Sequence, residues 1–263
     1  NKVYEPQQCV RELSAFLQDT PVDFVMSINF FPTVSAVCEI FKLRYLTWIV
    51  DAPVMELYSS AITNSVNRVF IFDREQYNDI HPFNPDGVFH LPLAGNVHSK
   101  QELFERTDSS TRARYTHDIA FVGSLYTEKC PYDRAKGIPD YYRGYFESIM
   151  RAQERVYGYY FIEELLTEEH VEAFRSHIDG FYGLPGDNFL TDRRTLSQLY
   201  IGNKITAMER VDTFMALSEV FSVDIYTASD TSGIPGLKNH GTAKTLTEMP
   251  IIFNQAGINL NMS

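Results

Sequence analysis

The N-terminal third of the chain alternates strand-like runs with helical segments, and this rhythm restricts the fold more than any other feature. Four apolar runs rich in β-branched and aromatic residues cover 22–29, 43–51, 67–73 and 86–94. Segments with helical spacing lie between them, at 33–42, 54–62 and 74–80. Such alternation indicates a parallel sheet with right-handed crossovers. Runs this apolar are typical of strands covered on both faces.

Polar residues stand at the carboxyl ends of three of these runs, namely Asn29, Asp51 and Asp73. Ligands bind beyond the carboxyl ends of the strands in open α/β sheets. Asn29 and Asp51 are therefore candidate catalytic residues. Asparagine and aspartate are also common turn and cap residues, so this second interpretation of Asp51 stays open.

Residues 95–117 are polar and contain no strand-like run, so they predict a linker with one helical turn. A strand at 118–122 then opens a second α/β region. We accordingly expect one domain over 1–117 and another over 118–263. The second contains further strands at 223–227 and 258–263 and helical stretches at 141–160, 167–178, 206–221 and 247–257.

Helix-capping signals accompany these helical stretches. Thr167 is a predicted N-cap, and Thr206 with Glu209 forms the pattern of a capping box. Thr247 is a predicted cap for the last helix, which Gly257 would stop. Because the chain ends on a fresh strand, the second domain is expected to be truncated and to carry a helical insertion.

Composition excludes several classes of protein. The net charge of -11 argues against a nucleic-acid-binding surface, which needs a basic face. Three cysteines without metal-site spacing fit a reducing cytoplasm. No window is apolar enough for a membrane span. The start is not a signal peptide and lacks Met, which indicates a fragment or a processed product.

The chain contains few recognisable catalytic motifs. Its seven histidines show no ligand spacing, so we expect no metal site and no bound cofactor. No GxSxG elbow, GxGxxG loop or P-loop occurs. Among two-domain α/β enzymes, the missing GxGxxG disfavours a nucleotide-sugar epimerase.

Three features remain as candidates for binding an anionic ligand. Gly123-Ser124 follows the strand at 118–122 and would let a phosphate reach the backbone, although a tight turn is the simpler interpretation. Arg210 falls near the predicted start of a helix, where an anionic partner or a salt bridge would explain it. The glycine-bearing loop 228–241 lies at a strand end, as binding loops do, with disorder as its alternative.

Several phrases taken together resemble a known family. They include "DFVMSINFFPTVSAVCE", "YLTWIVDAPVMELYS", "DIAFVGSLY", "MERVDTFMALSEVFSVDIYT" and "MPIIFNQAGINLNMS". In this order they resemble the bacterial CgeB-like glycosyltransferases, a branch of the GT-B superfamily associated with spore-surface and cell-surface glycosylation. The resemblance runs from about residue 22 to the last residue.

The resemblance implies an α/β fold of two Rossmann-like domains that face each other across a cleft. The first would be the acceptor-side domain and the second the donor-side domain, which binds the nucleotide sugar. The resemblance also implies a strand before residue 1 and, after residue 263, a glycine-rich loop with an acidic residue that grips the donor.

The resemblance further implies which residues bind the donor. The family's "FVGS" loop lies near the diphosphate and matches the stretch from Phe121 to Ser124, followed by Leu125 and Tyr126. Arg210 matches the arginine of the family's "eR" helix, and Thr227 ends the next strand. Gly241, Thr242 and Ala243 match the stretch that contacts the base.

The expected function is transfer of a hexosyl group from a nucleotide sugar, with UDP as the nucleotide, to a glycan or protein acceptor. The resemblance implies a retaining and metal-independent enzyme. Backbone donors and an arginine can take up the charge of a departing diphosphate, and Asp51 or Asn29 can orient or deprotonate an acceptor hydroxyl. The alternative is a non-catalytic GT-B-like scaffold that binds a glycan or a partner protein.

Overall fold

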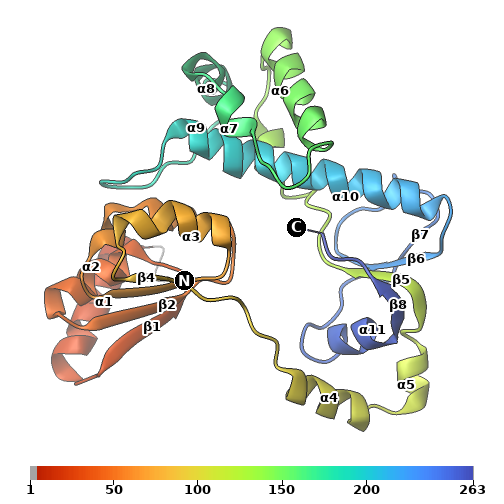
Figure 1. Cartoon of the computed structure of the whole chain (residues 1–263), viewed down its shortest axis with the longest axis horizontal. Helices are drawn as coiled ribbons and strands as arrows, with labels where there is room; N and C mark the ends of the chain where they lie inside the picture. Colours follow the sequence, from red (N-terminus) through yellow and green to blue (C-terminus); the bar gives the residue numbers. More distant parts are fainter. Residues whose placement is uncertain (1–4, 263) are drawn as a thin grey trace. The chain divides into compact units, whose positions relative to one another are not determined.

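The computed structural model describes residues 5–262, which form two compact units (Figure 1). The first unit comprises the chain up to Ala94 and the segment Tyr182–Asp192, and the second comprises Gly95–Phe181 and the chain from Arg193 onward. Each unit contains one parallel four-stranded sheet. The chain is therefore an α/β protein, consistent with two Rossmann-like domains.

The first sheet consists of β1 (Phe24–Ile28), β2 (Arg44–Trp48), β3 (Asn67–Ile71) and β4 (Val88–His90), in that order. All neighbours are parallel, and the four predicted strands are confirmed. The helices of this unit are α1 (Pro6–Asp19), α2 (Pro32–Phe41) and α3 (Arg74–Ile80), with short 3₁₀ turns at Met55–Tyr58, Ser60–Thr63 and His81–Phe83.

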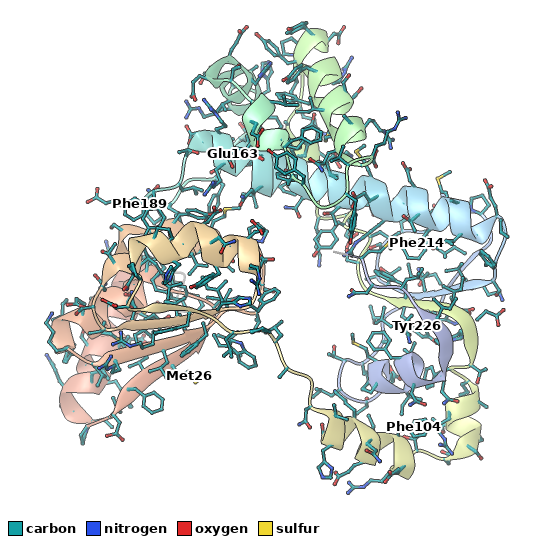
Figure 2. All side chains as sticks on the ribbon, in the orientation of Figure 1. Met26, Phe104, Glu163, Phe189, Phe214 and Tyr226 are labelled. Atoms are coloured by element: carbon teal, nitrogen blue, oxygen red, sulfur yellow. The ribbon has the colours of Figure 1, made fainter. Side chains whose placement is uncertain are left out.

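One face of β1 is open, so the expectation of strands covered on both faces is wrong there. Phe24, Met26 and Ile28 point to the same side and are 51%, 58% and 60% exposed. Figure 2 labels Met26 on this side. The strand order explains the opening. When parallel strands follow one another in sequence order, right-handed crossovers all fall on one face of the sheet.

The segment Tyr182–Asp192 packs in the first unit although it is distant in sequence. The Phe189 backbone N–H donates to the Tyr58 carbonyl at 2.7 Å. The ring of Phe189, labelled in Figure 2, stacks on Phe83 with centroids 4.2 Å apart. Sequence patterns predicted only a loop here. The first unit is therefore completed by residues that lie within the predicted second domain.

The second sheet has the order β7-β6-β5-β8 and is again parallel. Its strands are β5 (His117–Val122), β6 (Val223–Tyr226), β7 (Leu237–Asn239) and β8 (Ala256–Asn259). Helix α10 (Gly202–Ser218) and helix α11 (Met249–Gln255) lie on opposite faces of this sheet (Figure 1). This sheet is doubly wound, with its topological switch between β5 and β8.

Residues 95–113 are more ordered than a linker. They form α4 (Val97–Arg106) and α5 (Ser109–Ala113), and both helices contact α11 in the second unit. The compact second unit thus begins at Gly95, whereas the sequence placed the division after residue 117. Polar composition concealed these helices because most of their surface remains exposed.

A helical region separates β5 from β6, as predicted. It contains a 3₁₀ turn at Pro131–Arg134, then α6 (Asp140–Gln153), α7 (Ile162–Leu165), α8 (Glu168–Arg175) and α9 (Asp192–Arg194). Thr167 caps α8 and accepts a hydrogen bond from the His170 backbone N–H, which confirms that prediction. Buried aromatic rings, including those of Phe146 and Phe174, form the interior of this region.

Two other capping predictions are wrong. A π-helical turn at Thr195–Ile201 runs directly into α10, so Thr206 lies inside a helix and caps nothing. Helix α11 begins at Met249 with Glu248 at its N-cap, and Gly257 belongs to β8. In both cases packing extends or shifts an element beyond its local signal.

No helix among residues 5–262 is both long enough and apolar enough to cross a membrane.

Candidate functional site

The loop after β5 is a tight, internally bonded turn. The Gly123 N–H donates to the Tyr226 carbonyl at 3.1 Å. The Ser124 hydroxyl accepts the Tyr126 N–H at 2.8 Å, and Tyr126 adopts a left-handed backbone with φ of 63°. The Leu125 N–H donates to the Ser229 hydroxyl at 2.8 Å. Three backbone donors of the predicted phosphate loop, those of Gly123, Leu125 and Tyr126, are therefore already engaged within the protein.

Packing explains the glycine in this loop. A Cβ added to Gly123 would stand 2.8 Å from the tip of the Phe121 ring. That ring is fixed edge-on against Phe214 of α10, with centroids 5.1 Å apart. Figure 2 labels Phe214 on this helix. The close approach of Phe121 is sufficient to explain a glycine at position 123, as the turn interpretation requires.

Arg210 lies in the middle of α10, so its predicted place near a helix N-terminus is wrong. Its side chain is buried, and Nη1 donates to the Ser124 carbonyl while Nη2 donates to the Met262 carbonyl at 2.5 Å. The guanidinium carbon lies 4.7 Å from the centroid of the Tyr126 ring and 5.5 Å from that of Phe121. Through these two hydrogen bonds Arg210 joins the loop after β5 to the end of the chain after β8.

These two loops flank the switch point of the second sheet. Ser124 follows β5 and Met262 follows β8, and the crevice outside the carboxyl ends of such strands is where open α/β sheets bind ligands. Arg210 thus places a cation at the position that the topology favours for a ligand. Burial lowers the pKa of Arg210, and its Nε has no hydrogen-bond partner among the residues from Glu5 to Met262.

A carboxylate also lies beside this loop. The Ser124 hydroxyl donates to Glu128 Oε1 at 3.0 Å. Hydrogen bonds from the backbone and from nearby serine hydroxyls lower the pKa of Glu128, so it is ionised at neutral pH. A negative charge at the hydroxyl that would contact a diphosphate opposes anion binding until Glu128 turns away.

Thr227 and Ser229 form a buried hydroxyl pair behind the loop. The Thr227 hydroxyl donates to the Ser229 hydroxyl at 3.1 Å and accepts the Ser229 N–H at 3.1 Å. Ser229 in turn accepts from Leu125. Ser229 was not predicted as a site residue, because a serine in a Gly/Pro/Ser loop carries no local signal.

The remaining predicted donor residues lie elsewhere in the second unit. Gly241, with φ of 77°, donates its N–H to the Asn239 side chain at 2.9 Å, and Thr242 is exposed. Ala243 packs with the cluster on the α11 face, whereas Phe121, against which Arg210 lies, packs on the α10 face. The structure therefore brings together the loop at 123–126 with Arg210 and Thr227.

The two predicted catalytic residues meet in the first unit. The Asn29 side chain donates to Asp51 Oδ2 at 2.6 Å and accepts the Val50 N–H at 3.1 Å. Asn29 itself adopts a left-handed backbone with φ of 60°, which asparagine tolerates better than most residues. Asn29 therefore holds the exposed Asp51 carboxylate at the carboxyl end of the sheet.

A cluster of two histidines and a carboxylate occurs in the second unit, which local spacing could not reveal. His117, Asp224 and His240 come from β5, β6 and the residue after β7, and their ligand atoms lie within 4.8 Å of one another. His117 and Asp224 are more than 100 positions apart in sequence, and Asp224 and His240 are more than 15 positions apart. Only the pairing of strands brings them together.

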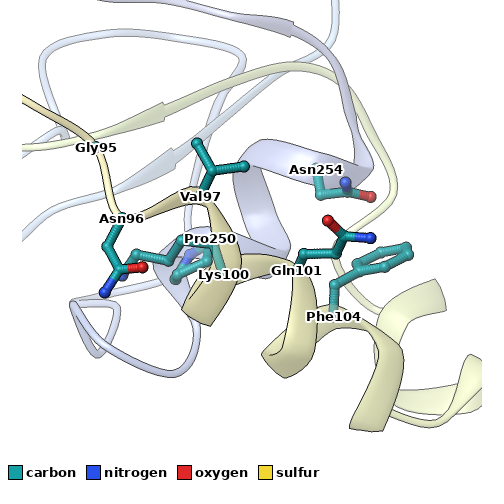
Figure 3. Close-up of a pocket in the computed structure, with 8 residues that line it drawn as sticks. All are labelled: Gly95, Asn96, Val97, Lys100, Gln101, Phe104, Pro250 and Asn254. Atoms are coloured by element: carbon teal, nitrogen blue, oxygen red, sulfur yellow. The ribbon is translucent and has the colours of Figure 1, made fainter.

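A hollow of about 380 Å³ lies between α4 and α11 (Figure 3). None of the predicted site residues lines it. Lys100 is the one charged side chain in its wall. The wall consists of Gly95, Asn96, Val97, Lys100, Gln101, Phe104, Pro250 and Asn254. Among the described residues that line it, none is a carboxylate or a histidine.

No protein-family model, curated protein or solved structure matches the chain.

Proposed function

We propose that this chain is part of a glycosyltransferase that transfers a hexosyl group from a UDP-sugar to a glycan or protein acceptor. In this proposal the second unit binds the nucleotide diphosphate and the first supplies the acceptor side. The observation that carries it is Arg210, a buried cation at the switch point of a doubly wound sheet. The resemblance of the sequence to CgeB-like enzymes supplies the reaction.

Charge explains how the proposed site would act. A departing UDP carries negative charge that fixed donors stabilise more strongly in a buried site than in water. Arg210 would exchange its carbonyl partners for phosphate oxygens, which are stronger acceptors. On the first unit, Asp51 would accept the proton of the acceptor hydroxyl, with Asn29 orienting it. The retaining, metal-independent course and the arrangement of two domains across a cleft belong to this proposal.

Two observations favour the alternative of a non-catalytic GT-B-like scaffold that binds a glycan or a partner. Glu128 places a carboxylate at Ser124, and Arg210 is already paired with two carbonyl oxygens. A scaffold would retain this arrangement because it never needs to accept a diphosphate.

Titration of the chain with UDP, followed by calorimetry, tests the proposal. We expect Arg210→Lys to weaken UDP binding by about tenfold or more, because a point charge replaces a two-pronged donor. Glu128→Gln should strengthen binding, because it removes a like charge. Arg151→Lys, on an arginine that is 56% exposed, is the matched control.

Incubation with a panel of UDP-sugars then separates the enzyme from the scaffold, since only the enzyme releases UDP. UDP affinity that is unchanged in both the Arg210 and Glu128 variants would refute the diphosphate site. Binding without UDP release from any sugar, with candidate acceptors present, would favour the scaffold.

A further inference from the structure

We propose that His117, Asp224 and His240 form a binding site for a divalent transition-metal ion of the Zn²⁺ type. The ligand atoms of the three residues lie within 4.8 Å of one another. Asp224 Oδ1 lies 2.6 Å from His240 Nε2 and 3.3 Å from His117 Nδ1. Two imidazoles that converge on one carboxylate oxygen make a ligand set that zinc commonly binds.

One ligand–ligand separation already matches that of a bound metal. Tetrahedral Zn²⁺ with bonds of about 2.0–2.1 Å holds its ligand atoms about 3.3 Å apart. His117 and Asp224 already stand at that separation. The ligand atoms of the two histidines lie within 4.8 Å of each other, so His240, whose side chain is 40% exposed, would shift to bring both of its separations to about 3.3 Å.

The ligand rings are oriented by a neighbouring tyrosine. The Tyr226 hydroxyl lies 2.7 Å from Nε2 of His117, the ring nitrogen that does not face Asp224. Metal-binding histidines are typically held in this way through their second nitrogen. The ring of Tyr226, labelled in Figure 2, also stacks on His240 with centroids 4.9 Å apart. Tyr226 thus fixes both imidazoles.

Two of the three proposed ligands are buried. The side chains of His117 and Asp224 are only 7% exposed. A buried carboxylate gains charge compensation from a bound cation.

The nitrogen ligands determine the class of ion. Imidazole suits zinc and its first-row neighbours, whereas Mg²⁺ and Ca²⁺ prefer oxygen ligands. Three protein ligands leave a fourth position open, and the exposed edge of His240 gives access to it. A bound ion would anchor His240, and with it the turn at Gly241, to β5 and β6.

Calorimetric titration of the chelator-treated chain with ZnCl₂ tests the site without any nucleotide, so its outcome is separate from that of the proposed function. We expect one tightly bound Zn²⁺ per chain and no comparable binding of Mg²⁺. His240→Ala and Asp224→Asn should each weaken Zn²⁺ binding by about 100-fold or more, since loss of a partner that merely orients a ligand costs 10–100-fold.

Two further variants make the result decisive. Tyr226→Phe should weaken Zn²⁺ binding by roughly tenfold, and His98→Ala, on a histidine that is 87% exposed on α4, should leave it unchanged. Circular dichroism verifies that each variant is folded. Absence of Zn²⁺ binding by the unmodified chain, or equal binding by folded His240→Ala, would overturn the site. An equal loss in His98→Ala would assign the ion to the surface instead.

Discussion

Replacement of Arg210 by methionine is the sharpest test of how the second unit is held together. Methionine keeps the length of the aliphatic stem and removes the guanidinium. The carbonyl oxygens of Ser124 and Met262 then lose their donors. A hydrogen bond to a charged group contributes about 1.5–3 kcal/mol, so two such bonds set the scale at about 3 kcal/mol.

Other contributions change this figure only modestly. Loss of the cation–π contacts with Tyr126 and Phe121 adds about 0.5–1 kcal/mol to the loss. Relief of the desolvation that lowers the pKa of Arg210 offsets part of it. We therefore expect the free energy of unfolding to fall by about 3 kcal/mol, which is about 1 M or more in the urea midpoint.

The assay uses two probes of urea unfolding. Far-UV ellipticity follows the helices, among which α6 and α10 are the longest of the second unit. Fluorescence follows Trp48, the single tryptophan, which lies on β2 of the first unit. We expect the ellipticity transition to move in Arg210→Met and that of Trp48 to stay.

Arg151→Met is the control, because Arg151 is 56% exposed and its surface ion pairs contribute about 0–1 kcal/mol. An unchanged ellipticity midpoint in Arg210→Met would refute the idea that this arginine joins the loops after β5 and β8. A shift confined to Trp48 fluorescence would do the same.

Three further predictions concern single positions. Asn29→Ala should lower the free energy of unfolding of the first unit by about 2–3 kcal/mol, because alanine is strained in the left-handed backbone conformation and the side-chain hydrogen bonds are lost. Asn29→Gly should lower it by less, because glycine tolerates this conformation. Trp48 fluorescence during urea unfolding measures both changes. Burial lowers the pKa of His170, so the folded protein favours the neutral ring and its stability should fall as the pH drops below about 6.5. His170→Gln should therefore reduce the pH dependence of the thermal unfolding midpoint in this range. Gly123→Ala should cost about 1–3 kcal/mol by forcing Phe121 aside, and an unchanged urea midpoint would show that the ring moves freely.

Strands β1 to β6 were predictable because each is a short apolar run with its own boundaries, whereas β7 lies in the predicted loop 228–241 and β8 begins inside the predicted helix 247–257. β1 to β4 fell inside the predicted runs, and β5 and β6 lay within a residue of theirs. The same runs located Asn29 and Asp51 at strand ends, and parallel pairing then brought those two side chains into contact. Local pattern sufficed where a feature depends on residues close together in sequence.

Helix ends were less predictable, because a capping signal competes with tertiary packing in deciding where a helix begins and ends. Thr206 and Glu209 have the pattern of a capping box, yet the backbone continues as a helix through them from the preceding π-helical turn. This continuation moved Arg210 from a helix start to a helix middle and removed the dipole argument for an anion there. Packing of the longer helix outweighed a signal of about 1 kcal/mol.

The sequence by itself determined the fold class and the position of polar residues at strand ends, because periodicity and turn chemistry act over a few residues. Tertiary structure alone decided which distant groups meet. It placed Tyr182–Asp192 in the first unit and directed Arg210 to two loops. It also brought together His117 of β5, Asp224 of β6 and His240, the residue after β7. Strand order and register fix such contacts, and they arise only when the sheet forms as a whole.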